Sequence, residues 1–179
     1  MNYSKTKQFL EVSTSVAVLL VAIVFLGSFV ANFWGTKTEG RQLTSGLQKD
    51  QTLPQIQGID YRSAPRTVII VVNTECAYCQ ESLPFYNRLA QLKQEKRSDI
   101  NLTAVFPNTK AEVNQYVTRN QLGLNAIAEV NLGTINVPAT PAILVVDNAG
   151  RVENFWLGKL SRDGEEEVVK ALGFYPFLG

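Results

Sequence analysis

Histidine is missing from the 179 residues of this chain, and cysteine occurs only twice. Without histidine the chain has no Ser-His or Cys-His catalytic pair, and it lacks the commonest zinc ligand. Two cysteines do not complete a four-ligand metal site, so we expect no metal and no other cofactor. Because there is no third cysteine, no stray thiol exists to mispair in an oxidising compartment.

An excess of charge is also missing. The 17 Lys and Arg residues nearly balance the 16 Asp and Glu residues, and from residue 37 onward 15 basic residues face 15 acidic ones. No basic run with interleaved aromatic residues occurs, so nucleic-acid binding has little support. The apolar fraction of 45% is enough for a hydrophobic core, and the length suits one ordinary domain with an appendage.

One long hydrophobic run lies near the N-terminus. Residues 12–36 carry no formal charge, and about 20 helical residues are enough to span the hydrocarbon layer of a bilayer. Phe33 and Trp34 place aromatic side chains at one end, as at a membrane interface. The sequence therefore predicts a short head at 1–11 and a transmembrane anchor at 12–34. A cleaved signal peptide fits poorly because no good small-x-small site follows the run, which is also long for a buried core helix.

The residues that flank the run set the expected orientation and the start of the domain. Two lysines precede the run and three basic residues follow it closely, so the positive-inside count does not decide the orientation. A short head before an apolar anchor is the usual form of a signal anchor, which exports the bulk of the chain. Residues 35–65 are polar and hold several Gly and Pro residues, which predicts a stalk and the start of the folded domain.

The remaining residues, 66–179, are predicted to form one domain with a central sheet. Continuous apolar runs rich in β-branched residues indicate strands that are buried on both faces. A turn sequence, Asp-Asn-Ala-Gly, separates the last two runs and indicates a hairpin. The predicted strands are 67–72, 101–106, 142–146 and 151–157.

Helices are predicted between these strands and after them. Apolar residues at helical spacing indicate a helix over 77–96. Thr109, followed three residues later by Glu112, has the pattern of a capping box and starts a second helix that ends near residue 122. A last helix, capped by Ser161 or Asp163, runs to about residue 172. This order of elements predicts a mixed α/β sheet covered by helices.

Cys76 and Cys79 lie where the first predicted strand gives way to a helix. Two intervening residues let the two sulfurs meet within one helical turn. The unpaired N–H groups and the macrodipole at a helix N-terminus favour the thiolate of the first cysteine, and a thiolate is the nucleophile of disulfide exchange. We therefore predict that Cys76 is the exposed attacking thiol and Cys79 the buried resolving thiol. An inert disulfide or two reduced thiols are the alternative readings of the pair.

Residues 66–172 resemble the thioredoxin superfamily at several separate motifs. Pro84, five residues after Cys79, matches the proline that kinks the active-site helix of that family. Thr140-Pro141, just before a predicted strand, matches the cis-proline loop, which in the family faces the cysteines and pairs with bound substrate. The resemblance implies a three-layer α/β/α sandwich with a mixed sheet, and it makes Thr140 and Pro141 substrate-binding residues.

The anchor, the polar stalk and this domain together resemble the TlpA-like, ResA-like branch of the superfamily. Its members are bacterial, membrane-tethered thiol–disulfide oxidoreductases that face the extracytoplasmic side. The resemblance implies a single-pass protein of the cytoplasmic membrane that reduces exported protein disulfides and receives electrons from a membrane thiol-shuttling donor. The alternative is a membrane-anchored binding or assembly module of the same fold in which the cysteines form a static disulfide.

Two residues depart from the pattern of the family. Glu75 stands where the family usually has Trp, and a carboxylate next to Cys76 is expected to raise the pKa of that thiol unless it points into solvent. Ile70 stands where thioredoxins carry a buried acid, so the proton of Cys79 needs another group or water. The two residues between the cysteines also differ from the Gly-Pro of thioredoxin, and the redox potential is therefore not carried over.

Overall fold

The structure is a computed structural model, and it describes residues 46–174. The predicted head at 1–11 and the predicted anchor at 12–34 lie outside the described residues, as does the first part of the predicted stalk. Within 46–174, none of the helices has both the length and the apolar character that a membrane span requires.

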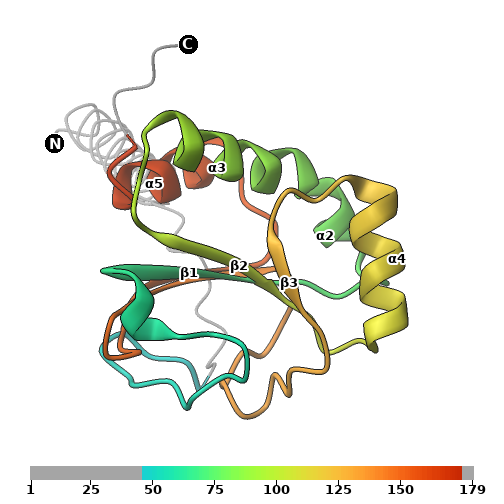
Figure 1. Cartoon of the computed structure of the whole chain (residues 1–179), viewed down its shortest axis with the longest axis horizontal. Coiled ribbons are helices and arrows are strands. Elements are labelled where there is room, and N and C mark those ends of the chain that lie inside the picture. The colour runs from blue at the N-terminus through green and yellow to red at the C-terminus, as the bar shows by residue number, and fades with distance from the viewer. Residues whose placement is uncertain (1–45, 175–179) are drawn as a thin grey trace, which may run out of the picture. The chain divides into compact units, whose positions relative to one another are not determined.

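A five-stranded mixed sheet forms the centre of the domain, in the order β3-β2-β1-β4-β5 (Figure 1). β1 runs parallel to β2, which runs parallel to β3, whereas β4 is antiparallel to both β1 and β5. The predicted mixed sheet is thus confirmed. The strands are β1 (Arg66–Val71), β2 (Asn101–Val105), β3 (Asn125–Ile127), β4 (Ala142–Asp147) and β5 (Val152–Leu157).

Burial explains why four strands were predictable from the sequence and one was not. β1 is the central strand, and every side chain from residue 68 to 72 is fully buried, which accounts for its continuous apolar run. β3 lies at the edge of the sheet and has only three residues, one exposed and two half-buried. Because so short a strand has no apolar run and no periodicity, the sequence did not predict it.

One face of the sheet is covered by helices. Phe85, Tyr86 and Leu89 of α3 share a core cluster with strand residues of β1, and so do Val168 and Val169 of α5. α4 contributes buried residues to the same cluster and lies next to the edge strand β3. Figure 1 shows α3 and α5 above the sheet. The helices are α2 (Ala77–Glu81), α3 (Leu83–Glu95), α4 (Lys110–Asn120) and α5 (Arg162–Ala171).

The opposite face is covered by irregular chain. Two segments, 46–65 and 128–141, pack there and contain no helix longer than the single turn η1 (Tyr61–Ser63) (Figure 1). A three-layer α/β/α sandwich was predicted, but within 46–174 the third layer is a layer of loops. Both segments hold Gly and Pro and lack helical apolar spacing, so neither favours a helix.

The segment 46–65 belongs to the folded domain. Its buried side chains complete the core of this face, and its backbone pairs with the start of β5 through Asp50 N–H to Val152 O at 2.8 Å. The sequence assigned these residues to the stalk and the start of the domain; from residue 47 onward they carry apolar side chains that the sheet buries. Those side chains are Leu47, Leu53, Ile56, Ile59, Tyr61 and Ala64.

Candidate functional site

The turn between β1 and α2 positions Cys76. The Asn73 side chain accepts a hydrogen bond from Glu75 N–H at 2.9 Å, and the Asn73 carbonyl accepts one from Cys76 N–H at 3.1 Å. The loop between β2 and α4 also holds this turn, because Thr74 N–H donates to Asn108 Oδ1 at 3.1 Å. Cys76 is thereby placed as the N-cap of α2, with extended backbone.

Cys76 and Cys79 are both free thiols, and they differ sharply in exposure. Cys76 is partly exposed and accepts a hydrogen bond at its sulfur from Cys79 N–H, over 3.2 Å. Cys79, a residue of α2, is fully buried at 0% exposure in the core cluster that also contains residues of α3. The arrangement agrees with the predicted order of an accessible attacking thiol and a buried second thiol.

The pKa values of the two thiols move in opposite directions. Partial burial acts to raise the pKa of Cys76. It is outweighed by hydrogen bonds from the side chain and backbone of Cys79, the side chain of Thr140 and the backbone of Tyr78, so the pKa is lowered. Burial is the main cause that raises the pKa of Cys79 to about 12. A thiolate therefore forms more readily at Cys76 than at Cys79.

Strand pairing brings the loop before β4 to Cys76. Val71 at the end of β1 is paired with Ala142 at the start of β4, so residues after one strand meet residues before the other. The Cys76 thiol donates to the Thr140 carbonyl over 3.5 Å, and the Thr140-Pro141 peptide bond is cis. The structure thus places the predicted loop against Cys76.

The two residues that depart from the family pattern, Glu75 and Ile70, differ in exposure. Glu75 is exposed and does not appear among the groups that lower or raise the pKa of Cys76. The sequence left two possibilities for this carboxylate, that it raises the pKa of Cys76 or that it points into solvent and is screened, and the exposure of Glu75 fits the second. Ile70 is fully buried in the same core cluster as Cys79.

Pro84 lies just after the site and interrupts the active-site helix, as predicted. The single helix expected over 77–96 is divided at Ser82, which ends α2 and starts α3. Pro84 occupies the first turn of α3, where its missing N–H is not needed. The break separates the short helix that begins at the cap residue Cys76 from α3.

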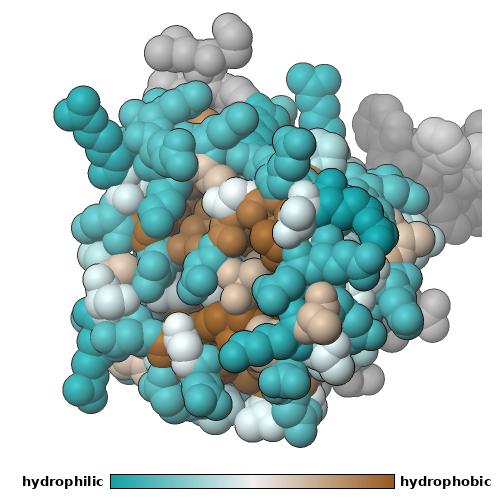
Figure 2. Space-filling model, turned by 45° about the vertical axis from the view of Figure 1, so that its right-hand side comes forward, coloured by the Kyte–Doolittle hydropathy of each residue, from teal (hydrophilic) through white to brown (hydrophobic). Residues whose placement is uncertain are grey.

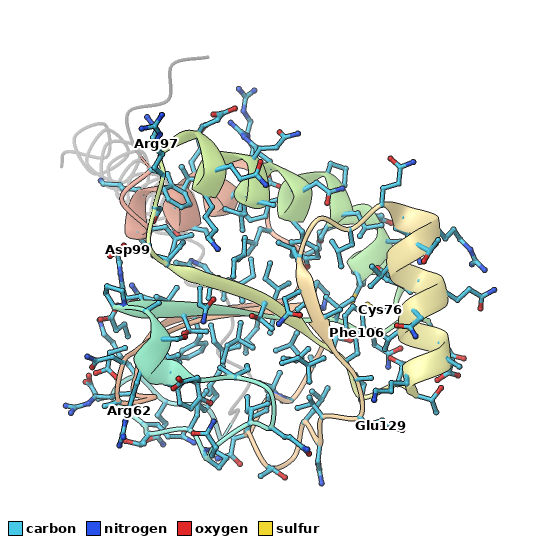
Figure 3. The ribbon with its side chains drawn as sticks, viewed as in Figure 1. Arg62, Cys76, Arg97, Asp99, Phe106 and Glu129 are labelled. Atoms are coloured by element: carbon cyan, nitrogen blue, oxygen red, sulfur yellow. The ribbon has the colours of Figure 1, made fainter. Side chains whose placement is uncertain are left out.

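The thiol site lies at one end of the sheet and on the surface. In Figure 3 Cys76 and Phe106 lie at that end, far from Arg62, Arg97 and Asp99 at the other. Tyr78, between the cysteines, is 61% exposed and is the one large apolar side chain among the described residues that is so exposed. Within residues 46–174, no group of acidic, cysteine or histidine residues is suited to hold a metal ion.

A separate hollow of about 510 Å³ opens between α4, β3 and the segment 54–58. Figure 2 shows apolar side chains in the middle of the face that carries these elements, surrounded by polar ones. The lining includes Ile56, Ile127 and Lys110 but neither cysteine, so the hollow is not the thiol site.

Sequence reasoning missed three residues near the site. Asn108 orients the active-site turn, but its side chain has no sequence signal beyond that of an ordinary loop asparagine. Tyr86 and Tyr116, on α3 and α4, are buried phenols whose pKa values are raised mainly by burial and further by the two thiols. Their helical spacing gave only the signal of core aromatic residues.

This fold, with a cysteine pair at the start of the first helix after the central strand, is the thioredoxin-like fold, and comparison with solved structures agrees. No protein-family model and no curated protein sequence matches this chain. The thioredoxin domain of a thiol-disulfide oxidoreductase from Bacteroides vulgatus superposes with a TM-score of 0.56 at 15% identity, covering 70% of this chain and 97% of that one.

Two further structures have similar values. A thiol:disulfide interchange protein from a Bacteroides species gives a TM-score of 0.56 at 15% identity, over 71% of this chain and 91% of that one. A secreted Mycobacterium tuberculosis disulfide oxidoreductase, described as homologous to E. coli DsbE, gives a TM-score of 0.50 at 14% identity. The match covers 64% of this chain and 84% of that one. The likeness shows the fold that the sequence predicted, and these neighbours are thiol-disulfide oxidoreductases, the class that the resemblance implied.

Proposed function

We propose that this protein is a thiol–disulfide oxidoreductase that acts on protein disulfides through Cys76 and Cys79. The observation that carries the proposal is the pairing of a partly exposed thiol of lowered pKa with a fully buried thiol three residues later. The Cys76 thiolate attacks a substrate disulfide, forms a mixed disulfide and releases one substrate thiolate. Cys79 then attacks Cys76, the Cys76–substrate bond breaks, and the second substrate thiolate leaves. The substrate gains two electrons, and the enzyme is left as a Cys76–Cys79 disulfide.

The surroundings of Cys76 favour a macromolecular substrate. The thiol is partly exposed, the neighbouring Tyr78 projects into solvent, and neither cysteine lines the hollow beside α4. A polypeptide brings its disulfide to such a surface and can contact the adjacent Thr140-Pro141 loop, for which we propose the substrate-binding role. The exposed Tyr78 ring offers apolar area to residues beside the substrate disulfide.

We further propose that residues 12–34 tether the domain to the cytoplasmic membrane and that the domain faces the extracytoplasmic side. The uncharged apolar run and the resemblance to membrane-tethered oxidoreductases support this location. The substrates are then exported proteins, and a membrane thiol-shuttling protein returns the Cys76–Cys79 disulfide to the dithiol. Membrane fractionation of the full chain, and protease access to the domain from outside intact cells, test the tether and its orientation.

The activity is tested by insulin reduction with the full-length chain in detergent and dithiothreitol as the electron source. The wild type is expected to accelerate reduction, Cys76→Ser to abolish the acceleration, and Cys79→Ser to accumulate a mixed disulfide through Cys76. Cys76→Ser that retains wild-type activity refutes the role given to this thiol.

The direction of exchange requires the reduction potential of the cysteine pair. We propose that the protein is a reductant. A potential near that of thioredoxin, about −270 mV, supports this direction, and one near about −120 mV, the value of a strong oxidant, contradicts it. A potential far below the glutathione range, with no turnover of insulin, favours instead a binding or assembly module with a static disulfide.

A further inference from the structure

A carboxylate is held close to the partly exposed thiol, because Glu75 directly precedes Cys76 and is exposed to solvent. The turn fixes its backbone, since Glu75 N–H donates to Asn73 Oδ1 at 2.9 Å and Cys76 N–H donates to the Asn73 carbonyl at 3.1 Å. Consecutive Cα atoms are about 3.8 Å apart, which keeps the carboxylate within about 12 Å of the Cys76 sulfur in every rotamer. A substrate disulfide that reaches Cys76 therefore meets this charge.

The other charges in the segments around the site are paired. The segments that hydrogen bonds link to the β1–α2 turn, directly or through a neighbour, are the loops 106–109, 138–141 and 158–161. Together with residues 73–81 they contain three charged side chains, Glu75, Glu81 and Lys159. Glu81 and Lys159 form an ion pair, whereas Glu75 forms none with any residue of the described part of the chain. These segments thus present one negative charge without a counter-charge.

Tyr78, two residues after Cys76, adds a second group that attracts cations. Its side chain is 61% exposed, and among residues 46–174 it is the one large apolar side chain that is so exposed. The face of an aromatic ring attracts a Lys ammonium or an Arg guanidinium that lies within about 6 Å of the ring centroid. A carboxylate before the thiol and an exposed ring after it both favour a substrate that carries positive charge next to its disulfide.

Water screens the Glu75 carboxylate in the free protein, in agreement with its absence among the groups that shift the pKa of Cys76. A polypeptide that binds over Cys76 displaces part of this water, and two charges interact more strongly where water is excluded. A basic side chain beside the substrate disulfide is then attracted, and an acidic one is repelled. Glu75 can therefore distinguish substrates even though it has little effect on the free thiol.

We propose that Glu75 makes the site selective for polypeptide disulfides flanked by basic residues, with support from the ring of Tyr78. The inference rests on the proposed function, because a preference among substrates requires that Cys76 attacks them. Glu75 determines specificity and takes no part in the bond exchange.

The attack on such a substrate balances without a further reactant. The Cys76 thiolate forms a bond to one substrate sulfur, the substrate S–S bond breaks, and the electron pair leaves on the other sulfur, which takes a proton from solvent. A basic residue beside the leaving sulfur lowers the pKa of the departing thiol, and a thiol of lower pKa leaves faster. Because this intrinsic effect also favours basic substrates, the test has to separate it from the effect of Glu75.

Three tripeptide disulfides of different charge provide the probes. They are the homodimers of Lys-Cys-Lys, Ser-Cys-Ser and Glu-Cys-Glu with blocked termini. The full-length reduced protein in an uncharged detergent is mixed with each at pH 7 and low salt, and the loss of reduced protein is followed by acid quenching and mass spectrometry. Each rate constant is divided by that of mercaptoethanol with the same peptide, which removes the intrinsic reactivity of the disulfide.

The ratio of the corrected rate constants for the Lys and Glu peptides measures charge selectivity. We expect this ratio to be about fivefold lower in Glu75→Gln than in the wild type at about 10 mM salt, since exposed ion pairs have this order of strength. The difference should shrink to below about twofold at about 1 M salt, where charges are screened beyond about 3 Å. The Ser peptide should react equally with both proteins. Tyr78→Leu should lower the ratio by about twofold.

Glu95→Gln is the matched control, because it removes the same charge far from the site. Glu95 is exposed at the end of α3, two residues before Arg97, which Figure 3 shows at the opposite end of the sheet from Cys76. We expect its ratio to stay within about twofold of the wild type.

Several outcomes contradict the inference or its basis. An unchanged ratio in Glu75→Gln overturns it, and so does an equal fall in Glu95→Gln, which would assign the effect to net charge. A rate with the Ser peptide that changes as much as the others in Glu75→Gln also overturns it, because Glu75 would then act on the thiol. An unchanged ratio in Tyr78→Leu refutes the support given by the ring. A wild-type protein that reacts with none of the three peptides faster than mercaptoethanol does instead refutes the proposed function.

Discussion

The lowered pKa of Cys76 leads to a prediction about the neighbouring thiol. Among the hydrogen bonds that lower this pKa, that from the Cys79 side chain is the largest. Cys79→Ala removes the donor, whereas Cys79→Ser keeps one in the form of a hydroxyl. A hydrogen bond to a charged group contributes about 1.5–3 kcal/mol, and because water competes at the partly exposed Cys76 we take about 1 kcal/mol. The thiolate-to-thiol ratio of Cys76 should therefore be about fivefold lower in Cys79→Ala than in Cys79→Ser.

The ultraviolet absorbance of the thiolate over a pH series measures this ratio directly. Each variant keeps Cys76 as its single thiol, so the titration is free of the coupling that makes pKa values of a cysteine pair joint properties. The backbone N–H of residue 79, 3.2 Å from the Cys76 sulfur, is present in both variants and cancels from the comparison. Equal titration curves for the two variants would refute the assignment of the lowered pKa to the side chain of Cys79.

Three other predictions concern the scaffold of the site. Thr109→Ala should lower the free energy of unfolding by about 1 kcal/mol in urea titrations, because it removes the cap of α4. Hydrogen bonds from Thr109 lower the pKa of Glu112, so this part of the stability is present above the unfolded pKa of Glu112 and is lost as pH falls through the folded pKa. The difference in free energy of unfolding between Thr109→Ala and the wild type should narrow as pH falls through the folded pKa of Glu112. A difference that stays constant with pH would argue against a role of the Glu112 carboxylate. Asn108→Ala should speed hydrogen exchange at the Thr74 amide, whose acceptor it removes, and unchanged protection would contradict that role. Gly150→Ala should cost about 1–2 kcal/mol in thermal unfolding, because φ there is 77° and an added Cβ lies 3.0 Å from an aromatic ring; an unchanged melting temperature would contradict it.

The elements that the sequence predicted are those whose burial has a regular pattern. The fully buried strands β1 and β4 appear as unbroken apolar runs, and the capping box of Thr109 and Glu112 marks the start of α4 where the structure has it. The layer of loops under the sheet was not predicted, since the burial of side chains such as Ile56 and Ile135 depends on distant strands and leaves no local period.

The candidate site was predictable only as far as its local part. Cys76 and Cys79 were found because spacing and a strand-to-helix junction are local features. Thr140, 64 residues away from Cys76, was assigned through family resemblance alone, because spacing along the chain does not show which loops meet. The sequence did not decide whether Glu75 raises the pKa of Cys76 or points into solvent, and the hydroxyl of Tyr116 could be recognised as unpartnered only once its surroundings were known.

The pairing of β1 with β4 has a consequence for when the site is completed as the chain folds. The reactive thiol lies on a segment made early in the chain, but the loop that contacts it is fixed only when residue 142 pairs with residue 71. A chain that ends before β4, or has not yet folded that far, still contains both cysteines but lacks the contact between Cys76 and Thr140. The contact between Cys76 and Thr140 therefore forms only in a chain that has folded as far as β4.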